Sequence, residues 1–212
     1  MSGIRDDFLS AARSAAALLR DPAVTAAWEE PSALPEFGVG ALAGHMVNQI
    51  LLVPRLLEDP VPEEPVVSLV DHYGRSLWVD AGLDDEVNVT IRLGGEQIAA
   101  EGPRALAEHV DSVVEELAVR LPSAPERPVR FPWWGPWSLT FDDALVTRTV
   151  ELVVHSDDLA VSVGVPTPPL PESVVDRVIV LLSKVAARRH GPTAVLRALS
   201  RAERAPSNIT AF

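Results

Sequence analysis

The sequence contains no cysteine. Disulfide bonds, cysteine zinc sites and catalytic cysteine nucleophiles are therefore excluded. Any metal ion must be bound by histidine and carboxylate side chains. Any thiol chemistry must use a thiol that comes from outside the chain.

The chain also lacks a long apolar run and a cluster of basic residues. A membrane-spanning helix needs about 18 or more apolar residues in a row, and the apolar stretches here are soon interrupted, as at Asp176 and Arg177. The formal net charge is −12. Nucleic acids and anionic membranes both attract Lys and Arg, and the pair at Arg188 and Arg189 is too small to bind either. We therefore expect no nucleic-acid partner and no membrane association.

The first residues do not show the pattern of an export signal. A signal peptide is basic and then apolar, whereas Asp6 and Asp7 occupy that region here, so we expect a cytoplasmic protein. The 212 residues, 47% of them hydrophobic, suffice for a sizeable core. We expect one domain over residues 1–212.

Apolar residues recur at helical spacing along most of the chain, which predicts an all-α fold. We expect helices over about residues 4–20, 39–57, 66–81, 84–121, 141–163 and 171–189, and then a short helix. Pro54 should kink or end the second helix, and Gly94, Gly95 and Gly102 should break the fourth. Residues 88–93 (NVTIRL) have β-propensity. Helices joined by proline-rich links are typical of an antiparallel helical bundle.

The least regular segment covers about residues 122–140 and contains the sequence PWWGPW. A long loop in a compact domain is often functional. We assign Trp133 and Trp134 to the wall of a cofactor-binding pocket. The alternative is that the tryptophans of this cluster anchor the loop to the core.

A polar stripe marks the predicted helix over about residues 141–163. Arg148, Glu151, His155 and Asp158 follow one another at spacings of three, four and three, so they share one face of a helix that is otherwise mostly apolar. Burying an ionisable group is costly unless it is paired or bound to a metal ion. The stripe must therefore face solvent or be satisfied internally.

Glu151 and His155 lie one turn apart and can hold one metal ion between them. A third ligand must come from another helix, and His45 is the best candidate because its context, ALAGHMVNQILL, is apolar. Simpler interpretations stay open. The Glu–His pair can be a surface pair, His45 a hydrogen-bonded core histidine, and Arg148 and Asp158 an ordinary ion pair. The remaining histidines have more polar neighbours, and we expect them to be solvated: His72, His109 and His190.

Three segments resemble the mycothiol-dependent maleylpyruvate isomerase family, a branch of the DinB-like superfamily: GALAGHMVNQ, TRTVELVVHSDDLA and LRALSRAERAPSNITAF. Many DinB-like proteins have histidine where this chain has Glu151, and the glutamate matches the maleylpyruvate isomerase branch. The resemblance covers most of the chain. It implies a DinB-like antiparallel four-helix bundle with extra short helices and the Pro/Trp-rich loop.

The resemblance also implies a functional site. His45, Glu151 and His155 would bind a divalent metal ion, with zinc as the expected ion and positions left open for catalysis. Asp158 and Arg148 would orient ligands or line the pocket. Zinc would favour the thiolate of an incoming thiol, which in this family is mycothiol, the small thiol of actinobacteria.

The implied function is that of a metal-dependent, mycothiol-using transferase or isomerase that acts on a small electrophilic molecule, with Asp158 and Arg148 as candidate catalytic residues. One alternative is a non-catalytic bundle that binds a small ligand or a protein partner. Another is a metal-dependent hydrolase with Asp158 as base. DinB-like proteins often pair, so a homodimer is a further expectation. The family's isomerases carry an additional C-terminal domain, so the resemblance implies the metal–thiol site more directly than the isomerase reaction.

Overall fold

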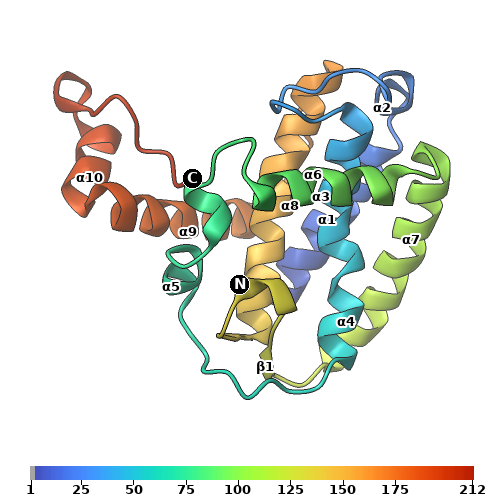
Figure 1. The fold of residues 1–212 in the computed structure, drawn as a ribbon, viewed down its shortest axis with the longest axis horizontal. Helices are drawn as coiled ribbons and strands as arrows, with labels where there is room; N and C mark the ends of the chain where they lie inside the picture. The colour runs from blue at the N-terminus through green and yellow to red at the C-terminus, as the bar shows by residue number, and fades with distance from the viewer. Residues whose placement is uncertain (1–2) are drawn as a thin grey trace.

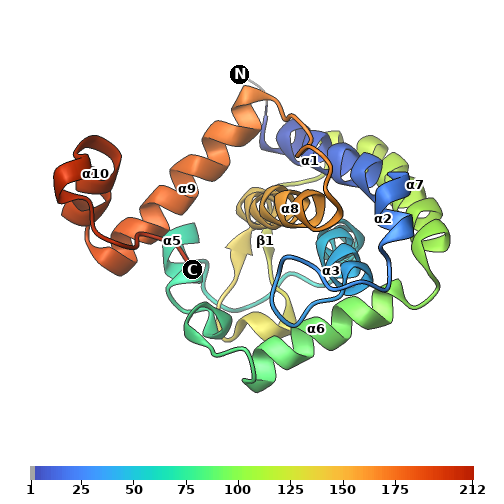
Figure 2. The ribbon, with the colours of Figure 1, turned by 90° about the horizontal axis from the view of Figure 1, so that it is seen from above.

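The structure is a computed structural model that describes residues 3–212. Four long helices form its centre: α1 (Ile4–Leu19), α3 (Val39–Leu51), α7 (Pro103–Arg120) and α8 (Phe141–Val163). Both α1 and α3 pack against α7 and α8, and Figure 2 shows the four helices grouped together. Their apolar faces enclose the main core, with fully buried side chains such as Phe8, Leu42 and Phe141. The all-α fold predicted from the sequence is confirmed.

The direction of three helices follows from the contacts of Arg5, near the start of α1. Its Nε donates to Asp142 Oδ1 (2.9 Å) at the start of α8, so α1 and α8 run in parallel. Its Nη1 donates to the carbonyl oxygen of Leu121 (3.0 Å), which directly follows the end of α7, so α7 runs opposite to α1.

Helix α3 runs opposite to α8. His45 on α3 lies beside His155 on α8, and one turn later Gln49 meets Arg148, which comes earlier on α8. The four helices therefore run up, down, down and up in chain order. The two consecutive helices that run the same way, α3 and α7, need a long crossover between them.

That crossover contains α6 (Glu86–Ala99), which lies across the bundle in Figure 1 and packs on α3. The expected break at Gly94 and Gly95 and the β-propensity of residues 88–93 are both overruled, because this segment is helical throughout. A Cβ on Gly95 would lie 2.4 Å from the carbonyl oxygen of Ala41. Because glycine lacks this atom, the backbones of α3 and α6 can touch at Gly95. This packing outweighs the low helix propensity of glycine and the β-propensity of residues 88–93. The expected break at Gly102 is confirmed, with a φ of 87°.

Two other predicted helices are shorter than expected. Residues 39–57 divide into α3 and α4 (Val53–Glu58), because Pro54 fits the first turn of a new helix. The prediction over residues 66–81 is wrong for its first part: Val67 donates its backbone N–H to the carbonyl of Ser138 (3.0 Å), which holds this part extended. Helical turns follow only in α5 (Leu69–Tyr73) and the 3₁₀ turn η1 (Leu77–Asp80).

Short elements make up the connections. They are α2 (Pro22–Ala26), η2 (Leu121–Ser123), β1 (Pro128–Val129), η3 (Pro132–Trp134) and β2 (Leu139–Thr140), and β1 pairs with β2 in an antiparallel ladder. The ladder and η3 form the Pro/Trp-rich loop that precedes α8.

Helices α9 (Glu172–His190) and α10 (Pro192–Ser200), followed by η4 (Ala202–Arg204), extend away from the bundle. The start of α9 is fixed to α1 by Asp7, which is 1% exposed and accepts hydrogen bonds from Ser173 (2.7 Å) and Arg177 (2.8 Å). None of the described helices is long and apolar enough to span a membrane.

Candidate metal centre

Helix α8 supplies most of the polar groups of the centre. Thr140 caps the first turn of α8 by accepting a hydrogen bond from the backbone N–H of Asp143 (3.1 Å). Asp142 and Asp143, the acidic side chains of that turn, interact favourably with the positive end of the helix dipole. Gly164, in the left-handed conformation with a φ of 71°, ends the helix. Between these two ends the helix is regular, so the polar stripe predicted from the spacing lies on one face.

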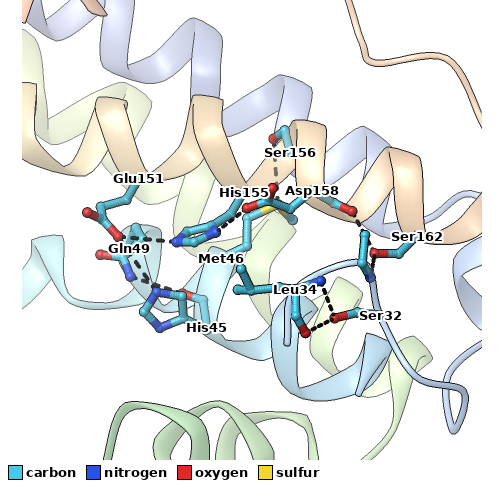
Figure 3. Close-up of polar contacts among 11 residues, drawn as sticks. Ser32, Leu34, His45, Met46, Gln49, Glu151, His155, Ser156, Asp158 and Ser162 are labelled. Carbon is cyan, nitrogen blue, oxygen red and sulfur yellow. Dashed lines mark hydrogen bonds and ion pairs between the residues drawn. The ribbon is translucent and has the colours of Figure 1, made fainter. Parts of the chain in front are cut away.

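The structure brings the three predicted ligands together between α3 and α8 (Figure 3). Glu151 Oε2 lies 3.6 Å from His45 Nε2 and 3.4 Å from His155 Nε2. One ligand atom from each residue lies within 4.8 Å of the other two. Ligands bound tetrahedrally to zinc at about 2.0–2.1 Å lie about 3.3 Å apart. The donor set and its spacing therefore fit one divalent ion.

The centre is accessible from solvent. The side chains of His45 and Glu151 are each 15% exposed, and that of His155 is 16% exposed. The ring of Phe37, from the connection between α2 and α3, lies 6.0 Å from the ring of His45. The ligands are thus largely buried, yet they keep a path to solvent.

Asp158 sets the orientation of His155. Its Oδ2 lies 2.9 Å from His155 Nδ1, so the carboxylate engages this nitrogen and leaves Nε2 directed at Glu151. Carboxylates commonly orient metal-binding histidines in this way. The side chain of Asp158 is 29% exposed and forms the outer end of the polar stripe.

Without a metal ion, the three ligands hold one another in defined charge states. Burial alone would raise the pKa of Glu151, but hydrogen bonds from His155 and His45 hold it well below the usual range. Burial alone would lower the pKa of His155, but Asp158 and Glu151 outweigh it and raise that pKa to about 9. Burial lowers the pKa of His45. Glu151 and protonated His155 therefore form an ion pair. A metal cation between them would take the place of the proton on His155 Nε2.

Arg148 continues the stripe one turn before Glu151. Its Nη1 donates to Gln49 Oε1, and Gln49 Nε2 donates to the backbone carbonyl of His45 (3.0 Å). Arg148 forms no ion pair among residues 3–212. The alternative in which Arg148 and Asp158 form an ordinary ion pair is therefore wrong. Gln49 was not predicted as a site residue, although its position one turn after His45 on an apolar helix was a usable signal.

The comparison with known families matches this arrangement. The family model for the mycothiol maleylpyruvate isomerase N-terminal domain matches residues 8–160, more than half of the chain. The chain belongs to this family. The match runs from α1 to α8 and spans all three candidate ligands. No curated protein and no solved structure matches the chain.

The Pro/Trp-rich loop contacts the polar stripe of α8 through Phe131. The ring of Phe131 lies 5.8 Å from the guanidinium carbon of Arg148 and 4.6 Å from the ring of Trp133, which stacks on it. Trp133 is 57% exposed, whereas Trp134 is 8% exposed and packs edge-on against His72. Trp134 therefore anchors the loop, whereas Trp133 lies on its exposed side.

The expectation that His72 is solvated is wrong. It is 3% exposed, its Nδ1 accepts a hydrogen bond from Trp137 Nε1 (3.1 Å), and burial lowers its pKa to about 4. Its sequence neighbours are polar, but the tryptophan loop folds over it from elsewhere in the chain. His109 is exposed as expected, and His190 is half-buried with Nε2 2.8 Å from the carbonyl oxygen of Thr210.

Proposed function

We propose that this chain is a metal-dependent, mycothiol-using transferase or isomerase that acts on a small electrophilic molecule. The observation that carries the proposal is the cluster of His45, Glu151 and His155 in a member of a mycothiol-related family. Three protein ligands leave coordination positions free, as catalytic rather than structural zinc sites do. Zinc is the proposed ion because it accepts imidazole, carboxylate and thiolate ligands.

A bound zinc ion would supply the positive charge that lowers the pKa of a thiol and favours its thiolate. His45, Glu151 and His155 would hold the ion, and Asp158 would keep His155 in the tautomer that presents Nε2. Arg148, which has no anionic partner among the described residues, would bind the electrophile. Trp133 would cover the thiol from the exposed side of the loop, while Trp134 supports the loop by packing against His72.

The hydrolase alternative requires Asp158 to act as a base toward water. The carboxylate of Asp158 is instead engaged with His155 Nδ1 at 2.9 Å. This contact favours an orienting role for Asp158 over the role of a base.

The first test is elemental analysis of the purified protein beside a Glu151→Ala, His155→Ala double variant. We expect about one zinc ion per chain in the parent protein and none in the double variant. The zinc-loaded protein is then incubated with mycothiol and a panel of electrophiles, and conjugates are detected by mass spectrometry. A parent protein that binds no metal when zinc is supplied would overturn the proposal. Bound zinc without any conjugate would favour the non-catalytic alternative.

A further inference from the structure

An open groove of about 830 Å³ runs between α9 and the N-terminal parts of α1, α5 and α8. Apolar side chains of these three helices line one side of it, among them Ile4, Leu69 and Val146. Helix α9 forms the other side, and Figure 2 shows this helix at the edge of the molecule, outside the four central helices. None of the three candidate metal ligands lines this α9 groove, which is therefore separate from the metal centre.

Helix α9 presents exposed apolar side chains beside the groove. Val180, which lines it, is 51% exposed, and the neighbouring Ile179 is 55% exposed. Val175, one turn before Ile179, is 36% exposed. Adjoining exposed apolar residues beside an apolar groove are typical of a surface that another molecule covers.

The charged residues of α9 are arranged symmetrically about Val180. Glu172 and Asp176 lie two turns and one turn before it, and Lys184 and Arg188 lie one turn and two turns after it. Residues four apart lie along one side of an α-helix, and all of these residues except Arg188 line the groove. This side of α9 is therefore acidic, then apolar, then basic.

Most of these charges have no partner within the described chain. Glu172, Asp176 and Lys184 form no ion pair or side-chain hydrogen bond among residues 3–212, whereas Arg188 pairs with Asp71 (2.8 Å). Asp176 and Lys184 lie about 12 Å apart along the helix axis, which is too far for them to pair with each other.

The remaining charged groups of the groove do have partners. Arg177 pairs with Asp7 (2.7 Å), and Asp143 is hydrogen-bonded to Thr140 at the start of α8. Among the described residues, the unpartnered charges of the groove are therefore confined to α9. A molecule that covers this surface must neutralise negative charge at one end of α9 and positive charge at the other.

A second α9 in antiparallel orientation has this distribution of charge. Its basic half would lie against Glu172 and Asp176, its acidic half would lie against Lys184, and the two Val180 side chains would meet at a twofold axis. A parallel orientation would place like charges together, and a partner of uniform charge would be repelled by half of the surface. Antiparallel pairing of two identical surfaces also gives a closed, symmetrical dimer.

We propose that the α9 groove binds α9 of a second copy of this chain in an antiparallel homodimer, with Asp176 beside the partner's Lys184. Burial of the exposed apolar residues supplies most of the affinity, because exposed ion pairs contribute little, and the charges set the orientation. Helix α9 lies beyond residues 8–160, which the family model matches, so the dimer does not follow from membership of the family. It does not depend on the metal centre either.

The contact can be located chemically because Lys184 is the only lysine of the chain. A carbodiimide joins an amine directly to a carboxylate that touches it. In a mixture of unlabelled and ¹⁵N-labelled protein, the cross-linked dimer should yield a peptide of mixed labelling that joins Lys184 to Asp176 or Glu172. Cross-links from Lys184 to carboxylates elsewhere on the second copy would overturn the antiparallel pairing.

Charge reversal on α9 tests the pairing by sedimentation equilibrium of the full chain. Lys184→Glu and Asp176→Lys each place two like-charge contacts in the dimer and should raise its dissociation constant about 10- to 100-fold. An equimolar mixture of the two variants should dimerise as the parent does, because both contacts of the mixed dimer then join opposite charges. Arg197→Glu is the matched control, since it makes the same change of charge at an exposed position of α10 outside the groove.

The outcomes separate the proposal from its alternatives. Asp176 and Lys184 have no partner among the described residues, so both variants should keep the helix content of the parent by circular dichroism, which excludes unfolding as the cause of dissociation. A parent protein that stays monomeric at every concentration would overturn the proposal. A dimer that neither variant weakens, that Arg197→Glu weakens equally, or that the mixture fails to restore would overturn it as well.

Discussion

His155 Nδ1 lies 2.9 Å from Asp158 Oδ2, and the other ring nitrogen of the same imidazole lies 3.4 Å from Glu151. One helix therefore supplies a candidate ligand and the group that orients it, within a single turn. The imidazole is held at both nitrogens, which fixes the direction of the Nε2 lone pair once the proton is lost. In the proposed metal centre, this relationship would influence how tightly the ion is bound.

Asp158→Asn should weaken zinc binding about 10- to 100-fold, because outer carboxylates of this kind typically contribute that much to metal affinity. The asparagine keeps the size of the side chain and removes its charge. Competition with a chromogenic chelator measures the affinity. Asp157→Asn is the control, since Asp157 is exposed and bonds to Thr167 instead of His155. Equal affinities of the two variants would remove Asp158 from the centre.

Zinc binding should release about one proton per ion at pH 7.5, because the metal-free protein holds His155 protonated with a pKa of about 9. The apparent affinity should therefore rise about tenfold per pH unit between about pH 7 and 8.5. Calorimetry in two buffers with different ionisation enthalpies gives the number of protons released. A heat of binding that does not depend on the buffer would contradict the pairing of His155 with Glu151.

The sequence was most informative where structure is local. The spacing of Arg148, Glu151, His155 and Asp158 predicted one polar face because an α-helix repeats every 3.6 residues, and the caps of α8 keep that helix regular to its end. His45 could be proposed because a histidine in an apolar helix needs a partner. The resemblance to a known family then selected the metal site from among the alternatives.

Features that depend on distant contacts could not be predicted in this way. His72 becomes buried only because Trp137, 65 residues further along the chain, folds over it. Gly95 lies inside a helix, against its low propensity, only because Ala41 of another helix touches it there. Neither contact leaves a periodic pattern around the residue concerned.

Gly95→Ala should destabilise the protein by about 1–3 kcal/mol, because the added methyl group would lie 2.4 Å from the carbonyl oxygen of Ala41 and force α3 and α6 apart. Gly94→Ala is the matched control in the same helix. No atom lies within 4 Å of a Cβ built at Gly94, so this change should stabilise the protein by about 0.5–1 kcal/mol through helix propensity. Urea unfolding measures both. A destabilised Gly94→Ala protein would contradict the helix at this position.

Acid should destabilise the protein partly through His72. The folded protein keeps this imidazole neutral with a pKa of about 4, whereas in the unfolded chain the imidazole takes up a proton near its ordinary pKa of 6.5. Protons therefore bind preferentially to the unfolded chain between these values. The contribution of His72 to stability is complete above about pH 6.5 and is lost as the pH falls toward about 4, by about 3 kcal/mol in all. Urea unfolding across this range should show a shallower pH dependence for His72→Gln than for the parent protein. His109→Gln, at an exposed position, should keep the steeper dependence of the parent, and identical curves for the two variants would show that His72 does not titrate on unfolding.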